Sequence, residues 1–350
     1  MPSSPRPPRA RSSSAAVDPA GSVVGVGLRY DTISFLSDFG HADEFVGVVH
    51  SVVRSIAPDV AVVDVTHGIT PHDVRAGGLA LARAANYLSP GVVGAGVDPG
   101  VGTARRPVAL EVGDGQSVLV GPDNGLLAPA VGLVGGTTRA VELTAEAYRL
   151  PSLGSTFDGR DVFAPAAAHL CLGVPITDLG PEIEPATLLP GVLPVSGWED
   201  GALSAEVLWI DSFGNCQLNV DPAEIDAFGP ELTVRIDDDV RVATRATAYD
   251  EIPTGRIGLV IDSSGLLSLA VARSSAATEL DLTEGAGVTL APLDDDDRGP
   301  GVVTSVALGP TRVQPTCCLL YTSDAADDFA VVVFWGGGGW LRGGGGGGGG

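Results

Sequence analysis

The stretch from Thr32 to Ile69 reads TISFLSDFGHADEFVGVVHSVVRSIAPDVAVVDVTHGI and indicates the class of fold. Short runs rich in β-branched residues stand at both of its ends and enclose a segment with helical periodicity. Within that segment apolar residues recur at three- and four-residue spacing from Phe45 to Ile56, and Pro58 stops the pattern. The stretch therefore predicts a β-α-β unit.

The same alternation continues after this unit. HDVRAGGLALARAANYL predicts a second helix, with a cap at 71–73 and with Leu79, Leu81 and Ala82 turned toward a sheet. GVVGAGVDPGVG predicts the next strand. We expect an α/β domain over residues 31–190 with buried parallel strands.

The segment EIEPATLLPGVLPVSGWEDG is rich in proline and glycine and predicts a linker, with a boundary near residue 190. Short strands separated by turn residues follow it, which favours a small β-barrel or sandwich domain over residues 191–295. We expect residues 1–30 to be disordered. We interpret residues 296–350, which end in a glycine run, as an artefactual low-complexity tail that resembles adapter read-through.

Charge and composition limit the partners. Lys and Arg number 20 against 43 Asp and Glu, a formal charge of -23, which argues against nucleic acid and suits a cationic small molecule better. No apolar run predicts a secretion signal or a membrane helix. The four cysteines form neither a zinc motif nor a disulfide framework, so we expect a reducing, cytoplasmic environment.

Four polar clusters follow predicted strands: SDFGHADEF, VDVTHGITPHD, VDPGVGTARR and GPDNG. Ligands of open α/β sheets bind outside the carboxyl ends of the strands, so we expect the four clusters to converge on one crevice. The third cluster lacks the spacing of a phosphate-binding loop. His67 and His72 straddle a turn rather than share a helix face, and we expect neither a metal nor a cofactor. No serine carries a nucleophile motif.

The chain resembles the S-adenosylmethionine hydroxide adenosyltransferase family, relatives of the enzymes that make fluorinated and chlorinated adenosine. The resemblance covers roughly residues 31–292 and rests on six motifs in the family's order: SDFGHADEFVG, VVDVTHGI, VDPGVGTARRPV, VGPDNGLL, STFDGRDVFAPAAAHL and WIDSFGNCQLNV. It implies a Rossmann-like N-terminal domain, a C-terminal β-barrel and a homotrimer whose sites lie at subunit interfaces. It also implies hydrolysis of S-adenosylmethionine to adenosine and methionine by water attack at the 5′ carbon.

The resemblance also assigns substrate contacts. Asp38 matches the carboxylate that holds the ribose hydroxyls, and Asp43 matches a partner of the methionine ammonium. Phe213 and Asn215, in DSFGN, match the adenine contacts of the barrel domain.

Asp98 and Arg105 match two members of the family's Asp-Arg-His set that handles the attacking water. The third member stands where this chain has Asp158, because the family pattern is S-T-F-H-G-R-D and the sequence here is STFDGRD. Two alternatives stand beside hydrolysis, and that departure favours the first of them. One is a catalytically weak protein that binds S-adenosylmethionine or adenosine, and the other is a halogenase.

The rest of the STFDGRDVFAPAAAHL stretch has a structural interpretation. Arg160 and Asp161 are expected to fix the loop by an internal ion pair. The segment from Phe163 to Leu170 predicts a buried helix, and His169 is expected to be a core or interface histidine rather than a catalyst.

Overall fold

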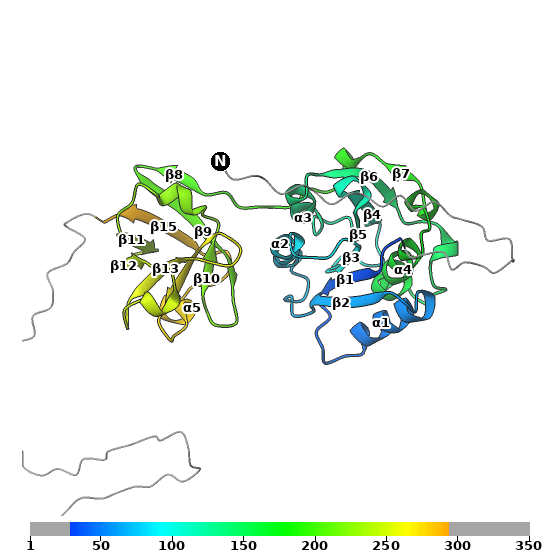
Figure 1. Cartoon of the computed structure of the whole chain (residues 1–350), viewed down its shortest axis with the longest axis horizontal. Helices are drawn as coiled ribbons and strands as arrows, with labels where there is room; N and C mark the ends of the chain where they lie inside the picture. The colour runs from blue at the N-terminus through cyan, green and yellow to red at the C-terminus, as the bar shows by residue number, and fades with distance from the viewer. Residues whose placement is uncertain (1–28, 294–350) are drawn as a thin grey trace, which may run out of the picture. The chain divides into compact units, whose positions relative to one another are not determined.

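A computed structural model describes residues 29–293. The predictions for residues 1–28 and 294–350 lie outside this range. The first domain is built on one seven-stranded sheet with the order β2-β1-β3-β5-β4-β6-β7 (Figure 1). Its strands are β1 (Thr32–Ser37), β2 (Ala61–Thr66), β3 (Val92–Gly96), β4 (Pro107–Val112), β5 (Ser117–Pro122), β6 (Thr137–Glu142) and β7 (Glu182–Ile183).

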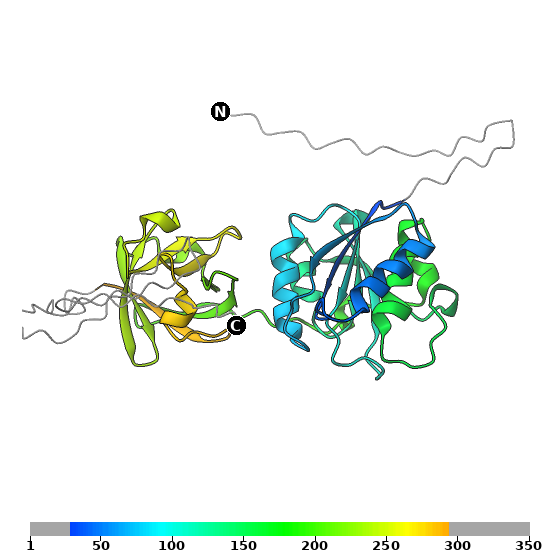
Figure 2. The same ribbon diagram turned by 90° about the horizontal axis from the view of Figure 1, so that it is seen from below.

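Helices cover both faces of this sheet. α1 (Phe45–Ile56) and α4 (Ala164–Cys171) pack on one face, and α2 (Val74–Ala85) and α3 (Ala128–Leu133) pack on the other (Figures 1 and 2). The predicted helices are confirmed. α2 begins after Asp73, whose carboxylate accepts a hydrogen bond from the Ala76 amide at 2.8 Å, as an N-cap residue does. Leu79, Leu81 and Ala82 are buried as expected.

The strands match the predicted parallel arrangement in part. β2, β1, β3 and β5 are parallel, whereas β4 runs antiparallel to both β5 and β6, and β6 runs antiparallel to β7. β3 is buried along its whole length. β2 is not, because it forms an edge of the sheet, and Val63 on it is exposed.

The second domain is a closed seven-stranded β-barrel, which decides between the predicted barrel and sandwich. Pairing of β10 with β9 closes the ring, and the short strand β8 adds to β9. Its elements are β8 (Gly197–Glu199), β9 (Ala202–Ile210), β10 (Cys216–Leu218), β11 (Glu231–Ile236), β12 (Asp239–Arg245), β13 (Ile257–Ile261), β14 (Leu267–Val271), α5 (Ala276–Glu279) and β15 (Gly287–Pro292).

The topology places several polar residues together at the carboxyl-terminal end of the parallel strands in the first sheet. β1, β2 and β3 are adjacent and parallel, so their carboxyl ends share one edge of the sheet. Asp38, His67 and Asp98 follow these three strands directly or by two residues. Over residues 29–293, no helix has the length and apolar character needed to cross a membrane.

Candidate active site

Arg105 lies between two carboxylates. Its Nε donates to Asp98 Oδ1 at 3.0 Å, and its Nη2 donates both to Asp98 Oδ2 and, at 2.5 Å, to Asp158 Oδ2. The side chains of Arg105, Asp98 and Asp158 are only 7%, 10% and 19% exposed. The structure thus brings together the three residues that the sequence analysis grouped by resemblance.

Burial shapes the electrostatics of this cluster. Loss of solvation raises the pKa of Asp98 above its ordinary value, and the negative charge of Asp158 adds to the rise, while the charge and hydrogen bonds of Arg105 oppose it. The Arg105 guanidinium also lies 5.6 Å from the centre of the Phe163 ring. Its Nη1 is buried and has no hydrogen-bond partner among the described residues. A buried donor of this kind is costly unless a water or ligand satisfies it.

Asp158 owes its place to a π-helical turn, η3 (Gly159–Phe163), which begins directly after it and runs into α4. The Asp158 carboxylate does not cap this turn, so it is available to Arg105. The predicted ion pair is confirmed, because Arg160 Nε and Nη2 donate to Asp161 Oδ1 and Oδ2 at 2.6 and 2.8 Å. Asp161 is buried, so the pair anchors the turn.

Gly102 allows the loop between β3 and β4 to approach the 155–158 segment. It has φ of +76°, a conformation that favours glycine, and a Cβ there would lie 2.8 Å from the Ser155 carbonyl oxygen. Because Asp98 and Arg105 lie on this loop and Asp158 follows Ser155, this close approach is part of how the cluster forms.

The predicted helix from Phe163 to Leu170 agrees with α4, which is buried nearly throughout. His169 on α4 packs edge-on against Tyr148, with ring centres 5.0 Å apart. Burial lowers its pKa below the ordinary value. It stays outside the Arg105 cluster, as expected for a core histidine.

Asp38 and Asp43 both lie between β1 and α1. Asp38 Oδ2 accepts a hydrogen bond from the backbone amide of His72 at 2.8 Å and so joins this loop to the one after β2. His72 itself has φ of 70°, in the left-handed region. Asp43 is exposed. The rings of Phe39 and Phe45 both contact Phe157, at centre distances of 5.6 and 5.0 Å, which packs this loop against the segment that carries Asp158.

The barrel domain contributes a separate loop, between β9 and β10. Asp211 Oδ1 accepts from the amides of Phe213 and Asn215, and Asp211 Oδ2 accepts from Asn215 Nδ2 at 2.8 Å. Gly214 has φ of +84°, and a Cβ there would lie 2.1 Å from Ser275 Oγ, so only glycine fits. This rigid turn presents the ring of Phe213 outward, with the residue 78% exposed.

The polar groups of GPDNG make structural contacts, and the convergence of all four clusters on one crevice stays a prediction. Asp123 is buried and accepts from Arg106 Nε at 2.9 Å and from the Leu189 amide at 2.8 Å. Arg106 also donates to Thr187. Asn124 bonds to the backbone of Val97 and Leu126. Asp123 and Arg106 thus tie the 187–189 segment to the sheet, whereas Asn124 fixes its own loop beside Val97.

The VDVTHGITPHD cluster contacts a histidine of α1, and the sequence motifs did not predict this contact. Asp64 and His67 meet His50 of α1 rather than His72. Burial works to raise the pKa of Asp64, but the interactions with the close His67 and His50 rings outweigh it and hold that pKa below its ordinary value. His50 lies with Ser51, Arg54 and Ser55 among the polar positions of α1, so the helical pattern of the sequence carried no signal for this contact.

Fold and site together define a two-domain protein. An α/β domain holds a buried Asp-Arg-Asp cluster beyond the ends of its strands, and a closed β-barrel presents an exposed aromatic residue on a rigid turn. The sequence profile of the SAM hydroxide adenosyltransferase N-terminal domain matches residues 33–180, and that of the C-terminal domain matches residues 205–289. The chain belongs to the SAM hydroxide adenosyltransferase family.

Several named proteins are similar to this chain in sequence. A protein of Salinispora arenicola named "(R)-S-adenosyl-L-methionine hydrolase" is 45% identical over 253 residues, which cover 72% of this chain and 95% of the relative. One of Thermus thermophilus with the same name is 44% identical, covering 74% and 98%. A fluorinase of Actinopolyspora mzabensis is 27% identical, covering 73% and 95%.

Two solved structures are similar in fold. An uncharacterized conserved protein from Thermotoga maritima superposes with a TM-score of 0.69 at 30% identity, covering 74% of this chain and 99% of its own. A conserved hypothetical protein from Thermus thermophilus superposes with a TM-score of 0.59 at 41% identity, with the same coverage.

Proposed function

We propose that this chain hydrolyses S-adenosyl-L-methionine to adenosine and L-methionine, and that it acts on the (R) sulfonium epimer named for its relatives. The observation that carries the proposal is Arg105, which is fixed between two carboxylates and whose buried Nη1 has no hydrogen-bond partner within residues 29–293. A water that accepts from Arg105 Nη1 would satisfy this donor.

The leaving group of this reaction, methionine, needs no assistance from the protein. The water oxygen bonds to C5′ while the C5′–S bond breaks, and the electron pair of that bond passes to sulfur and gives neutral methionine. No acid is needed, because the sulfonium is already a good leaving group. Catalysis reduces to placing the water in line with the C–S bond and removing its proton.

We assign these two tasks to Asp98 and Arg105. Asp98 accepts the proton, since a pKa raised by burial makes a carboxylate a better base. Arg105 holds the water and stabilises its developing hydroxide character. Asp158 completes the catalytic set by fixing the second edge of the guanidinium through Nη2. In a dry site the nucleophile's growing negative charge is attracted to the sulfonium.

Substrate contacts are proposed from both domains. Asp38 holds the ribose hydroxyls, Asp43 pairs with the methionine ammonium, and Phe213 and Asn215 contact the adenine. The outward-facing ring of Phe213 supports an aromatic stacking role. We propose a homotrimer in which the first domain of one subunit, 31–190, and the barrel of the next, 191–295, share each site. A cytoplasmic location is supported by the free, buried Cys171 and Cys216.

The proposal is tested by product analysis. Purified protein incubated with S-adenosylmethionine is expected to give adenosine and methionine in equal amounts, with chelator present and with or without halide. Binding by titration calorimetry without adenosine formation would instead support a binding protein. A halogenated product that requires added halide would support a halogenase, an alternative raised by the fluorinase relatives.

Phe213→Ala is expected to raise KM about 5-fold to 100-fold with kcat little changed, because loss of one base–aromatic stack costs about 1–3 kcal/mol. Steady-state kinetics with S-adenosylmethionine measure both constants. Tyr87→Ala is the matched control, since Tyr87 lies in the first domain and is also 78% exposed. A KM unchanged in Phe213→Ala would remove this residue from the site.

Asp158→Asn is expected to move the acidic limb of the pH profile of kcat/KM to lower pH. The charge of Asp158 contributes to the raised pKa of Asp98, so removing that charge lowers the Asp98 pKa and keeps the base ionised to lower pH. Asp239→Asn, which alters a surface carboxylate paired with Arg241, is expected to leave the profile unchanged. A limb that stays in place, or moves upward, would argue against Asp98 as the base.

A further inference from the structure

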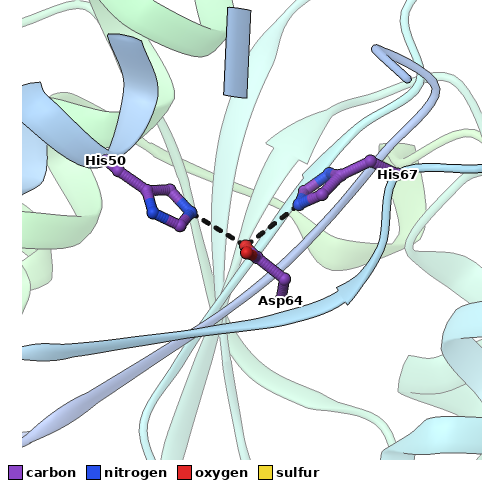
Figure 3. A group of neighbouring side chains, drawn as sticks. All are labelled: His50, Asp64 and His67. Atoms are coloured by element: carbon purple, nitrogen blue, oxygen red, sulfur yellow. Dashed lines mark hydrogen bonds and ion pairs between the residues drawn. The ribbon is translucent and has the colours of Figure 1, made fainter. Parts of the chain in front are cut away.

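Two histidines point at one carboxylate on the outer edge of the first sheet. His50 comes from α1, Asp64 from β2, and His67 directly follows β2. Figure 3 shows the two imidazole rings on opposite sides of the Asp64 carboxylate. Asp64 Oδ1 lies 2.8 Å from His50 Nε2 and 3.0 Å from His67 Nε2, and the three ligand atoms lie within 4.8 Å of one another.

His67 is positioned as metal-binding histidines usually are. Its side chain is fully buried, and its Nδ1 lies 2.7 Å from Ser37 Oγ, which also accepts from the Phe39 amide. A hydrogen bond at one ring nitrogen fixes the ring and directs the other nitrogen toward an ion. His67 Nε2 lies 3.0 Å from Asp64 Oδ1, but this buried nitrogen makes no hydrogen bond of proper geometry within residues 29–293.

The other two side chains leave the cluster open. Those of Asp64 and His50 are 38% and 35% exposed, which gives an ion a path from solvent and leaves room for water ligands. In a tetrahedral site with ligands at about 2.0–2.1 Å, ligand atoms stand about 3.3 Å apart. An ion bound by all three side chains would therefore move the Asp64 oxygen a few tenths of an ångström away from both imidazole nitrogens.

We propose that His50, Asp64 and His67 bind one divalent transition-metal ion, with zinc as the best fit. Two imidazoles and a carboxylate are a ligand set that zinc accepts, and water completes the coordination. The site is separate from Arg105 and is not needed for hydrolysis. It would act on the loop after β1, because the His67 carbonyl accepts from the Gly40 amide at 2.8 Å and the His41 ring lies 5.3 Å from that of His67.

The test is zinc titration by calorimetry on protein first stripped with chelator and then dialysed. The wild-type chain is expected to bind one equivalent, and Co²⁺ in place of zinc is expected to give a visible d–d absorption spectrum. His50→Gln and Asp64→Asn are expected to weaken zinc binding at least about tenfold. Both alter partly exposed side chains, so metal-free melting curves should match the wild type.

His169→Gln is the matched control, because it removes an imidazole from the same domain outside the cluster. It should bind zinc as the wild type does. Ser37→Ala is expected to lower affinity about tenfold by freeing the His67 ring. No saturable binding by the wild type, or His50→Gln binding as tightly as His169→Gln, would overturn the proposal and leave a hydrogen-bonded His-Asp-His chain.

The outcome of the zinc-binding test is independent of whether the chain hydrolyses S-adenosylmethionine. Metal-free protein that forms adenosine but never binds zinc would contradict the metal-site proposal and leave the hydrolase proposal standing. Protein that binds zinc through His50 and forms no adenosine would sink the hydrolase assignment alone. With both in place, saturating zinc is expected to raise the Tm of the wild type and not that of His50→Gln.

Discussion

Arg105→Met is expected to lower kcat by about 10²-fold to 10³-fold, the usual effect of losing one preorganised donor at a developing charge. Methionine keeps much of the side chain's length but leaves Asp98 and Asp158 facing each other without the cation between them. Their repulsion then favours protonation of the pair, which removes the base as well as the group that holds the water. Turnover at saturating S-adenosylmethionine measures the effect.

Arg139→Met is the control for this variant. Arg139 on β6 also pairs with two carboxylates, those of Glu111 on β4 and Glu182 on β7, but its side chain is 47% exposed. It should keep near-normal turnover. Arg105→Lys should fall between wild type and Arg105→Met, because an ammonium keeps the charge but not the two-edged geometry. A folded Arg105→Met enzyme with wild-type kcat would refute the assigned role.

Asp158→His is expected to raise turnover at neutral pH about tenfold to a hundredfold, near the low end of what a general base contributes. Imidazole is a stronger base than a carboxylate and can relay a proton near pH 7. The change also removes one of the two negative charges beside Arg105. KM should change little, because Asp38, Asp43 and Asn215 are the proposed substrate contacts.

Turnover at saturating substrate from pH 6 to 9 measures this gain. Asp158→Asn separates its two causes, because it removes the charge without adding a base. If Asp158→His exceeds Asp158→Asn, the imidazole is responsible. Turnover in Asp158→His equal to or below the wild type would show that Asp158 is itself an adapted catalytic residue, or that position 158 has no part in the reaction.

Local pattern predicted the helices but not the strand directions. The periodicity of Phe45 to Ile56 and the cap at Asp73 are properties of neighbouring residues, and the structure agrees with both. The antiparallel direction of β4 and the exposure of β2 depend on the order of strands in the sheet. An alternating run has the same composition in either direction, so the sequence contained no signal for this.

The site was predictable to different degrees. Asp98 and Arg105 are seven residues apart on one loop, whereas Asp158 is 53 residues from Arg105 and was joined to it only by resemblance. The role of Asp123 depends on its contact with the 187–189 segment, and that of His50 depends on its contact with Asp64. Spacing within a motif cannot reveal such partners.

Running the reaction in ¹⁸O-labelled water shows whether water attacks C5′. With chelator present and halide absent, mass spectrometry is expected to find one ¹⁸O atom in the 5′-hydroxyl of adenosine and none in methionine, the two products being equal in amount. Adenosine without the label, or no adenosine from protein that binds S-adenosylmethionine, would contradict water attack at C5′.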